Sequence, residues 1–96
     1  MVKIKVSNMI TSKGNPAENQ FIITKTSSRF NTTEVYFQSY NTTIAYMSEE
    51  TGVLLDKDSW DCSVTTGRYR NQFLGESIEE TRLKIKSGEY SLTNLN

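Results

Sequence analysis

The chain has 96 residues, enough for one domain with a single hydrophobic core and too few for two. Eleven Lys and Arg residues balance eleven Asp and Glu residues, so no overall charge attracts nucleic acid or an anionic membrane. There is no His, and the one Cys cannot form a disulfide within the chain. These counts remove the commonest general base and metal ligand, and they favour a protein of a reducing cytoplasm. We therefore treat residues 1–96 as one cytoplasmic domain.

The first six residues alternate apolar with charged side chains. Val2, Ile4 and Val6 are separated by two lysines, the pattern of a strand with one buried face. A signal peptide would need a continuous apolar stretch here, and no segment approaches the roughly 18 apolar residues that span a bilayer. We expect a strand at the N-terminus that ends at the turn-forming residues 12–16.

Four further segments are rich in aromatic and β-branched residues, which favour strands. The connections between them are short, and a parallel crossover takes a dozen residues or more, so consecutive strands should be antiparallel. A polar loop is expected at residues 27–32, between the first two of them. The expected strands are residues 19–26, 34–40, 43–47 and 53–56.

The periodicity changes after Trp60, and a helix is expected over residues 64–74. Ser63 is a suitable N-cap, and Gly75 stands where a left-handed residue ends many helices. Tyr69 and Phe73 are four residues apart, so both rings should face the sheet and join the core.

The opposite side of this helix carries Arg68, Arg70 and Asn71. A helix packed through its aromatic residues should present these three side chains to solvent. Arg is favoured at protein interfaces because its planar guanidinium can stack and hydrogen-bond at once. We expect this helix face to be the partner-binding surface.

A second helix is expected to begin after Ser77, where Ser77 and Glu80 form a capping-box sequence. It should run to about Ser87 and end at Gly88. Its apolar stripe is thin, which predicts a helix on the surface. Residues 89–96 form a polar tail that we expect to fray.

No motif indicates catalysis, a cofactor or a metal. Asp56, Asp58 and Asp61 have a spacing like that of a calcium loop, but Asp61 replaces its turn glycine and Gly67 its closing glutamate. Cys62 lacks a His to act as its base, so we interpret it as a small buried thiol. We expect a protein that is not an enzyme and needs no metal or cofactor.

The two expected helices and their Gly-containing turn also resemble a helix-turn-helix unit. Between Arg68 and Lys86 there are five basic and three acidic residues. This small excess falls short of the clear basic face that phosphate contacts need. Nucleic-acid binding by the helical hairpin is therefore the alternative, and a hairpin that covers a sheet is preferred.

Four segments together resemble a known family: residues 19–23 (Asn-Gln-Phe-Ile-Ile), residues 36–45 (Tyr-Phe-Gln-Ser-Tyr-Asn-Thr-Thr-Ile-Ala), residues 60–66 (Trp-Asp-Cys-Ser-Val-Thr-Thr) and residues 69–75 (Tyr-Arg-Asn-Gln-Phe-Leu-Gly). They are similar to small uncharacterised proteins of bacteriophages and mobile elements, over residues 8 to 95. Cys62 stands where this family often has Tyr. The connection from Thr24 to Thr33 is longer than is usual in the family, which implies a loop that is free to vary. The resemblance implies a phage-type accessory protein in a bacterial cytoplasm, and it carries no activity or functional residue with it.

We therefore expect an α+β fold, with an antiparallel sheet of four or five strands covered on one face by two C-terminal helices. The expected function is binding to a host protein or protein complex, for example as an inhibitor of a host enzyme or defence system.

Overall fold

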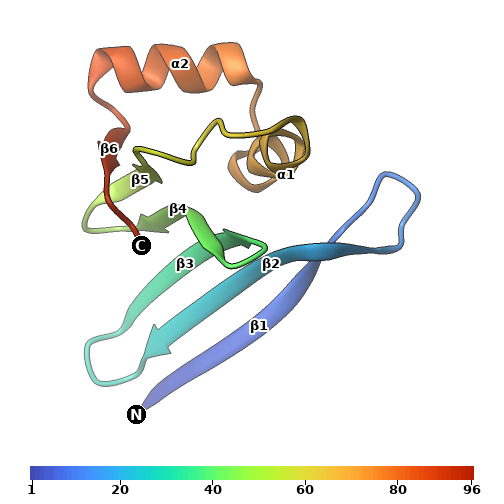
Figure 1. Cartoon of the computed structure of the whole chain (residues 1–96). Helices are drawn as coiled ribbons and strands as arrows, with labels where there is room; N and C mark the ends of the chain where they lie inside the picture. The colour runs from blue at the N-terminus through green and yellow to red at the C-terminus, as the bar shows by residue number, and fades with distance from the viewer.

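The computed structural model describes residues 1–96 and contains a six-stranded sheet and two helices (Figure 1). The fold is α+β, as the sequence predicted, but the sheet has one strand more than expected. In chain order the elements are β1 (Val2–Ile10), β2 (Pro16–Ser27), β3 (Thr32–Ser39), β4 (Thr42–Ser48), β5 (Gly52–Asp56), α1 (Val64–Leu74), α2 (Ile78–Ser87) and β6 (Ser91–Thr93).

The strands lie in the sheet in the same order as in the chain. Neighbours from β1 to β5 are antiparallel, which confirms the prediction from their short connections. β6 pairs with β5 in the parallel direction. A parallel pair needs a long crossover, and here α1 and α2 supply it.

The sixth strand lies in the segment that was expected to fray, so that expectation was wrong. The Lys57 N–H donates to the Thr93 carbonyl at 2.8 Å, and the Asn96 side chain both donates to and accepts from the Thr43 backbone. Tyr90 is buried at the start of this segment. A three-residue strand that pairs through its backbone needs no alternation of apolar residues. The sequence analysis therefore did not predict this strand.

The loop expected at residues 27–32 is a turn at residues 28–31, so it is shorter than the Thr24 to Thr33 region in which the resemblance implies a variable loop. Thr24 pairs with Val35 and Thr26 with Thr33, so β2 and β3 continue as a ladder and only residues 28–31 form the turn. The side chains here are polar, but a ladder is held by backbone hydrogen bonds that polar residues make equally well.

The core contains one row of residues across the middle strands. Phe37, Ala45 and Leu55 are paired neighbours on β3, β4 and β5, and each is fully buried. Met9 joins the core from within the register shift of β1 between Asn8 and Ile10. The apolar residues nearer the start of β1 stay outside it, so the expected half-buried first strand was wrong there.

Both helices have the ends that the sequence predicted. Ser63 caps α1, Ser77 and Glu80 form the capping box of α2, and Gly75 and Gly88 end the helices in the left-handed conformation. Tyr69 is buried as expected.

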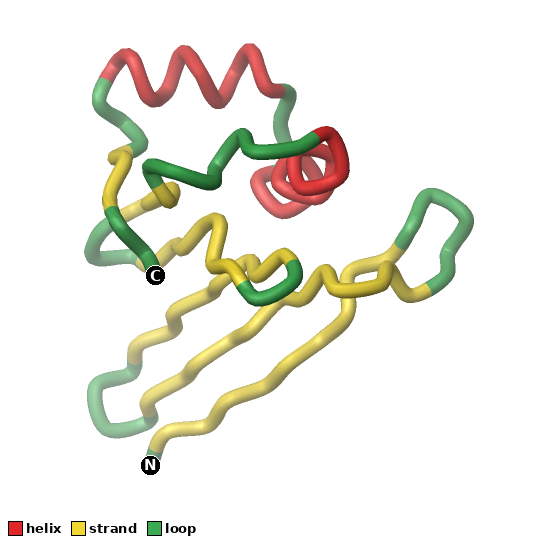
Figure 2. The backbone as a smooth tube through the Cα atoms, viewed as in Figure 1, coloured by secondary structure: helices red, strands yellow, loops and turns green.

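Each helix contributes to the core. Phe73 is half-buried and stacks on Phe37 with ring centroids 5.8 Å apart. Ile85 of α2 also packs against the core. The tube in Figure 2 shows both helices on the same side of the strands, while β1 and the far ends of β2 and β3 extend away from them.

Candidate protein-binding surface

The three residues expected to face a partner line one shallow surface hollow beside Asp61 and Cys62, but they differ in exposure. Arg68 is exposed, Asn71 is half-buried and Arg70 is buried with 2% of its surface accessible. The expectation that Arg70 faces solvent was therefore wrong. The Asn71 side-chain oxygen is also occupied, since it accepts a hydrogen bond from Arg70 Nη2 at 2.9 Å.

The buried Arg70 holds α1 to the connection that precedes it. Its Nη1 donates to the Trp60 carbonyl at 2.7 Å and to Asp61 Oδ1 at 3.2 Å, and its guanidinium lies 5.4 Å from the centre of the Trp60 ring. A buried charge is tolerated when it is paired and hydrogen-bonded in this way. Arg70 is therefore a structural residue.

Gly67 explains why Arg70 can fold inward. A Cβ atom at position 67 would lie 3.5 Å from Arg70 Nη2, which is ordinary van der Waals contact. Any larger side chain would occupy the space that the guanidinium fills. The glycine inside the helix was the one signal in the sequence that a long side chain from the next turn packs there.

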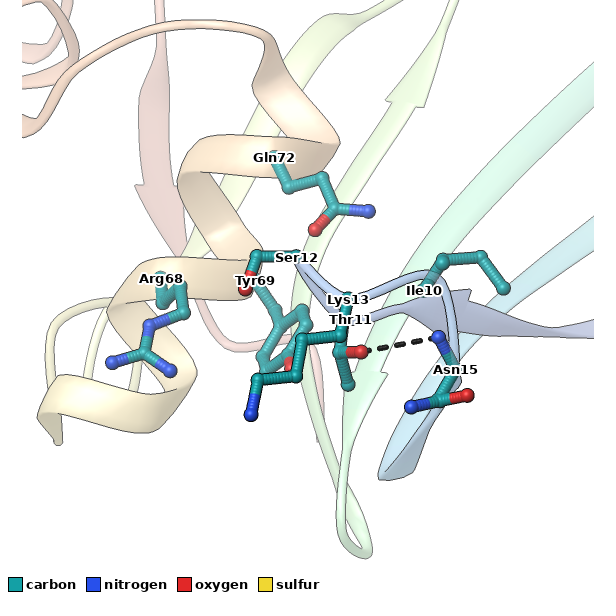
Figure 3. A pocket seen from close by; sticks show the side chains of 8 residues that line it. All are labelled: Ile10, Thr11, Ser12, Lys13, Asn15, Arg68, Tyr69 and Gln72. Atoms are coloured by element: carbon teal, nitrogen blue, oxygen red, sulfur yellow. Dashed lines mark hydrogen bonds between the residues drawn. The ribbon is translucent and has the colours of Figure 1, made fainter.

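Arg68 lies at a groove of about 700 Å³ between the β1–β2 turn and α1 (Figure 3). Most residues that line the groove are polar or charged. Two of them are cations, Arg68 from the helix and Lys13 from the turn, and neither forms an ion pair. The lining residues are Ile10, Thr11, Ser12, Lys13, Asn15, Arg68, Tyr69 and Gln72.

The face of the sheet opposite the core carries an apolar and aromatic row that the sequence analysis did not identify. By register, Val6 lies beside Ile23, Ile23 beside Tyr36, Tyr36 beside Tyr46, and Tyr46 beside Leu54. Strand side chains alternate between faces, so this row points away from Phe37, Ala45 and Leu55. We call these five residues the open row: Val6, Ile23, Tyr36, Tyr46 and Leu54.

Phe73 of α1 and Ile85 of α2 pack against the core, on the face opposite the open row. Figure 1 shows both helices on the same side of the strands. The Tyr36 and Tyr46 rings contact each other with centroids 4.9 Å apart, and both hydroxyls donate to the Glu34 carboxylate. Burial raises the pKa of the Tyr36 phenol, and the nearby Glu34 charge raises that pKa further. The row therefore combines apolar surface with aromatic residues whose hydroxyl groups are already hydrogen-bonded.

β1 forms one edge of the sheet and is exposed along most of its length. Val2, Ile4 and Val6 remain 52%, 66% and 60% exposed. The Ser28 N–H donates to the Met1 carbonyl at 3.1 Å, so Met1 and Ser28 form a hydrogen-bonded pair. Along an antiparallel strand, every second residue forms such a pair with the neighbouring strand. Lys3 and Lys5 therefore bond to β2, and the N–H and C=O groups of the three exposed apolar residues point outward, without a partner strand.

Two of the three carboxylates that suggested a calcium loop, those of Asp56 and Asp61, have protein partners. Asp56 accepts hydrogen bonds from Ser59 Oγ and from the Leu95 N–H. Burial alone would raise the pKa of Asp56, but these hydrogen bonds bring it below the usual value. Asp61 pairs with Arg70 and Arg82. Cys62, expected to be buried, is exposed.

One buried carboxylate remains, that of Glu76. It accepts hydrogen bonds from Lys84 Nζ at 2.7 Å, Thr81 Oγ1 at 2.6 Å and the Tyr90 hydroxyl at 2.9 Å. Burial would raise the pKa of Glu76, but these donors outweigh it and lower the pKa, while Glu76 raises the pKa of Lys84. With three donors in place, this carboxylate joins α2 to the C-terminal segment.

The fold and these surfaces define a small α+β domain with an uncovered sheet face and an open edge strand. Residues 4–90 match the model of a family described as "Family of unknown function (DUF8033)", so the chain belongs to that family. No curated protein and no solved structure matches the chain. Neither helix has the length and apolar character needed to cross a membrane.

Proposed function

We propose that this protein is a non-enzymatic binding factor that recognises another protein through the uncovered part of its sheet. The observation that carries the proposal is the open row together with the exposed start of β1. Contiguous apolar surface of this kind marks interaction sites, and Tyr is enriched at protein interfaces. Phe73 of α1 and Ile85 of α2 pack against the core on the other face, so they leave this surface to a partner.

The setting we propose is a bacterial cytoplasm, with the protein acting for a phage or mobile element on a host enzyme or defence complex. Its support is the sequence resemblance given above. The absence of His and the full hydrogen bonding of Glu76 also favour binding over catalysis.

Nucleic-acid binding by the helical hairpin is the second candidate. Three of its five basic residues, Arg70, Arg82 and Lys84, are engaged in ion pairs within the protein. On the open row, Tyr36 and Tyr46 offer rings on which bases stack, but the Glu34 charge between their hydroxyls repels phosphate. These contacts favour a protein partner.

A matched pair of variants tests the proposal. Val6 and Leu83 are similarly exposed, at 60% and 66%, and lie on the sheet and on α2 respectively. Tagged wild type, Val6→Asp and Leu83→Asp are used to capture proteins from a bacterial lysate, and circular dichroism confirms that each is folded. We expect a partner that Leu83→Asp retains and Val6→Asp loses.

A partner lost only from Leu83→Asp would contradict the proposed surface. Salt-sensitive binding of the wild type to oligonucleotides, without a protein partner, would establish the second candidate.

A further inference from the structure

The edge of β1 presents different chemistry on the two faces of the sheet. Val2, Ile4 and Val6 lie on the face of the open row, and Lys3 and Lys5 lie on the other. We propose that β1 binds an extended segment of the partner as an added strand, with apolar residues opposite the first three side chains and acidic residues opposite the two lysines. This inference rests on the proposed function and names its binding mode.

The outward backbone groups supply the affinity of such a strand. Strand addition uses main-chain hydrogen bonds for affinity and alternate side chains for specificity. Val2, Ile4 and Val6 provide three successive N–H and C=O pairs that point away from β2. The opposite edge of the sheet offers far less, since β6 has three residues and the chain beyond it turns back to bond with Asp56 and Thr43.

The charges select an acidic partner. Five ion pairs form within the protein, and neither Lys3 nor Lys5 takes part in any of them. Residues 1–33 also contain only one acidic residue, Glu18, against five basic ones, Lys3, Lys5, Lys13, Lys25 and Arg29. Opposite charges facing each other across strands are stabilising, and like charges are destabilising.

The same lysines disfavour a second copy of the chain as the occupant. Antiparallel pairing of two β1 strands with Ile4 at the centre sets Val2 opposite Val6, which suits the apolar side chains. It also sets Lys3 of each copy opposite Lys5 of the other. These would be non-hydrogen-bonded pairs, in which the side chains of facing residues lie closest together, so the lysines would repel each other. Lysines are a common protection of edge strands against self-pairing, and they leave this edge open to an acidic strand.

The test uses two capped synthetic peptides of nine residues, one alternating Val with Glu and one alternating Val with Lys. Binding to ¹⁵N-labelled protein is followed by NMR. We expect the Glu peptide to bind at least about tenfold more tightly than the Lys peptide, and to slow hydrogen exchange at the Val2, Ile4 and Val6 amides. The double variant Lys3→Glu, Lys5→Glu should reverse the preference.

Two further variants complete the design. Lys57→Glu with Lys86→Glu alters the net charge equally at exposed sites away from β1, and should keep the wild-type preference. Ile4→Pro removes one outward N–H without removing a bond to β2, and should abolish peptide binding in a protein whose NMR spectrum remains folded.

Three results would overturn the inference. The Glu peptide could fail to bind, or both peptides could bind equally well. The third is slow hydrogen exchange at the Val2, Ile4 and Val6 amides of a wild-type dimer in the absence of peptide. If any of these occurs while Val6→Asp still loses its captured partner, the proposed function stands and the strand-addition mode fails.

Discussion

At the scale of single residues, the main finding is that neighbouring arginines in one helix have opposite roles. Arg68 is exposed at a groove, whereas Arg70 is buried among Trp60, Asp61 and Gly67. Helical periodicity predicted that both arginines lie on the outer face. It takes no account of the space beside Gly67, one turn before Arg70, which the Arg70 guanidinium fills. Arg70 therefore bears on stability, and Arg68 remains available to a ligand.

Replacing each arginine by Ala distinguishes the structural role of Arg70 from the exposed position of Arg68. Arg70→Ala should lower the free energy of unfolding by about 3 kcal/mol, because it removes a buried hydrogen-bonded group and leaves the Trp60 carbonyl without its donor. Arg68→Ala, the matched control, should change it by less than about 0.5 kcal/mol. Urea denaturation measures both. Equal losses in the two variants would show that Arg70 is not anchored as described.

At the scale of elements, the crossover from β5 to β6 is held by polar contacts at both ends. Glu76 ties the start of α2 to Tyr90 beside β6, and Asp56 at the end of β5 binds the Leu95 backbone. Both carboxyl groups have a pKa below the ordinary value, because hydrogen bonds outweigh the effect of burial. The protein should therefore lose stability in acid.

Linkage between protonation and folding determines whether a fall in pH raises or lowers the free energy of unfolding. A group whose pKa is lower in the folded state stabilises the protein above its unfolded pKa, which is 4.5 for Glu76, and this contribution is lost as the pH falls through the folded value. Urea denaturation should show unfolding free energy falling below about pH 4.5. Glu76→Gln should be less stable at pH 7 and show a smaller decrease, whereas Glu79→Gln, at an exposed position of α2, should behave as wild type. An identical pH profile for Glu76→Gln would contradict this account.

At the scale of the whole molecule, local signals in the sequence predicted more than long-range ones. The helix caps at Ser63 and Ser77, the antiparallel meander and the buried Tyr69 were all visible as patterns within a few residues. β6 was missed because its pairing joins backbones far apart in the chain, and such pairing needs no distinctive side chains.

The candidate surface was missed for a related reason. Alternation in residues 2–6 predicted a buried apolar face, but alternation does not reveal whether anything covers that face. Only the assembled sheet shows that the helices lie on the other side of it and that β1 is an edge (Figure 1). The open row likewise collects one residue from each of five strands, and only the strand register brings them together.

The central claim is that β1 is an open edge with alternate backbone groups free, and amide hydrogen exchange of the unliganded protein tests it most directly. NMR should show the Lys3, Lys5 and Ser7 amides exchanging at least about tenfold more slowly than those of Val2, Ile4 and Val6, because only the first set bonds to β2. Equally slow exchange in both sets would contradict the account, since it would mean that the edge is already paired.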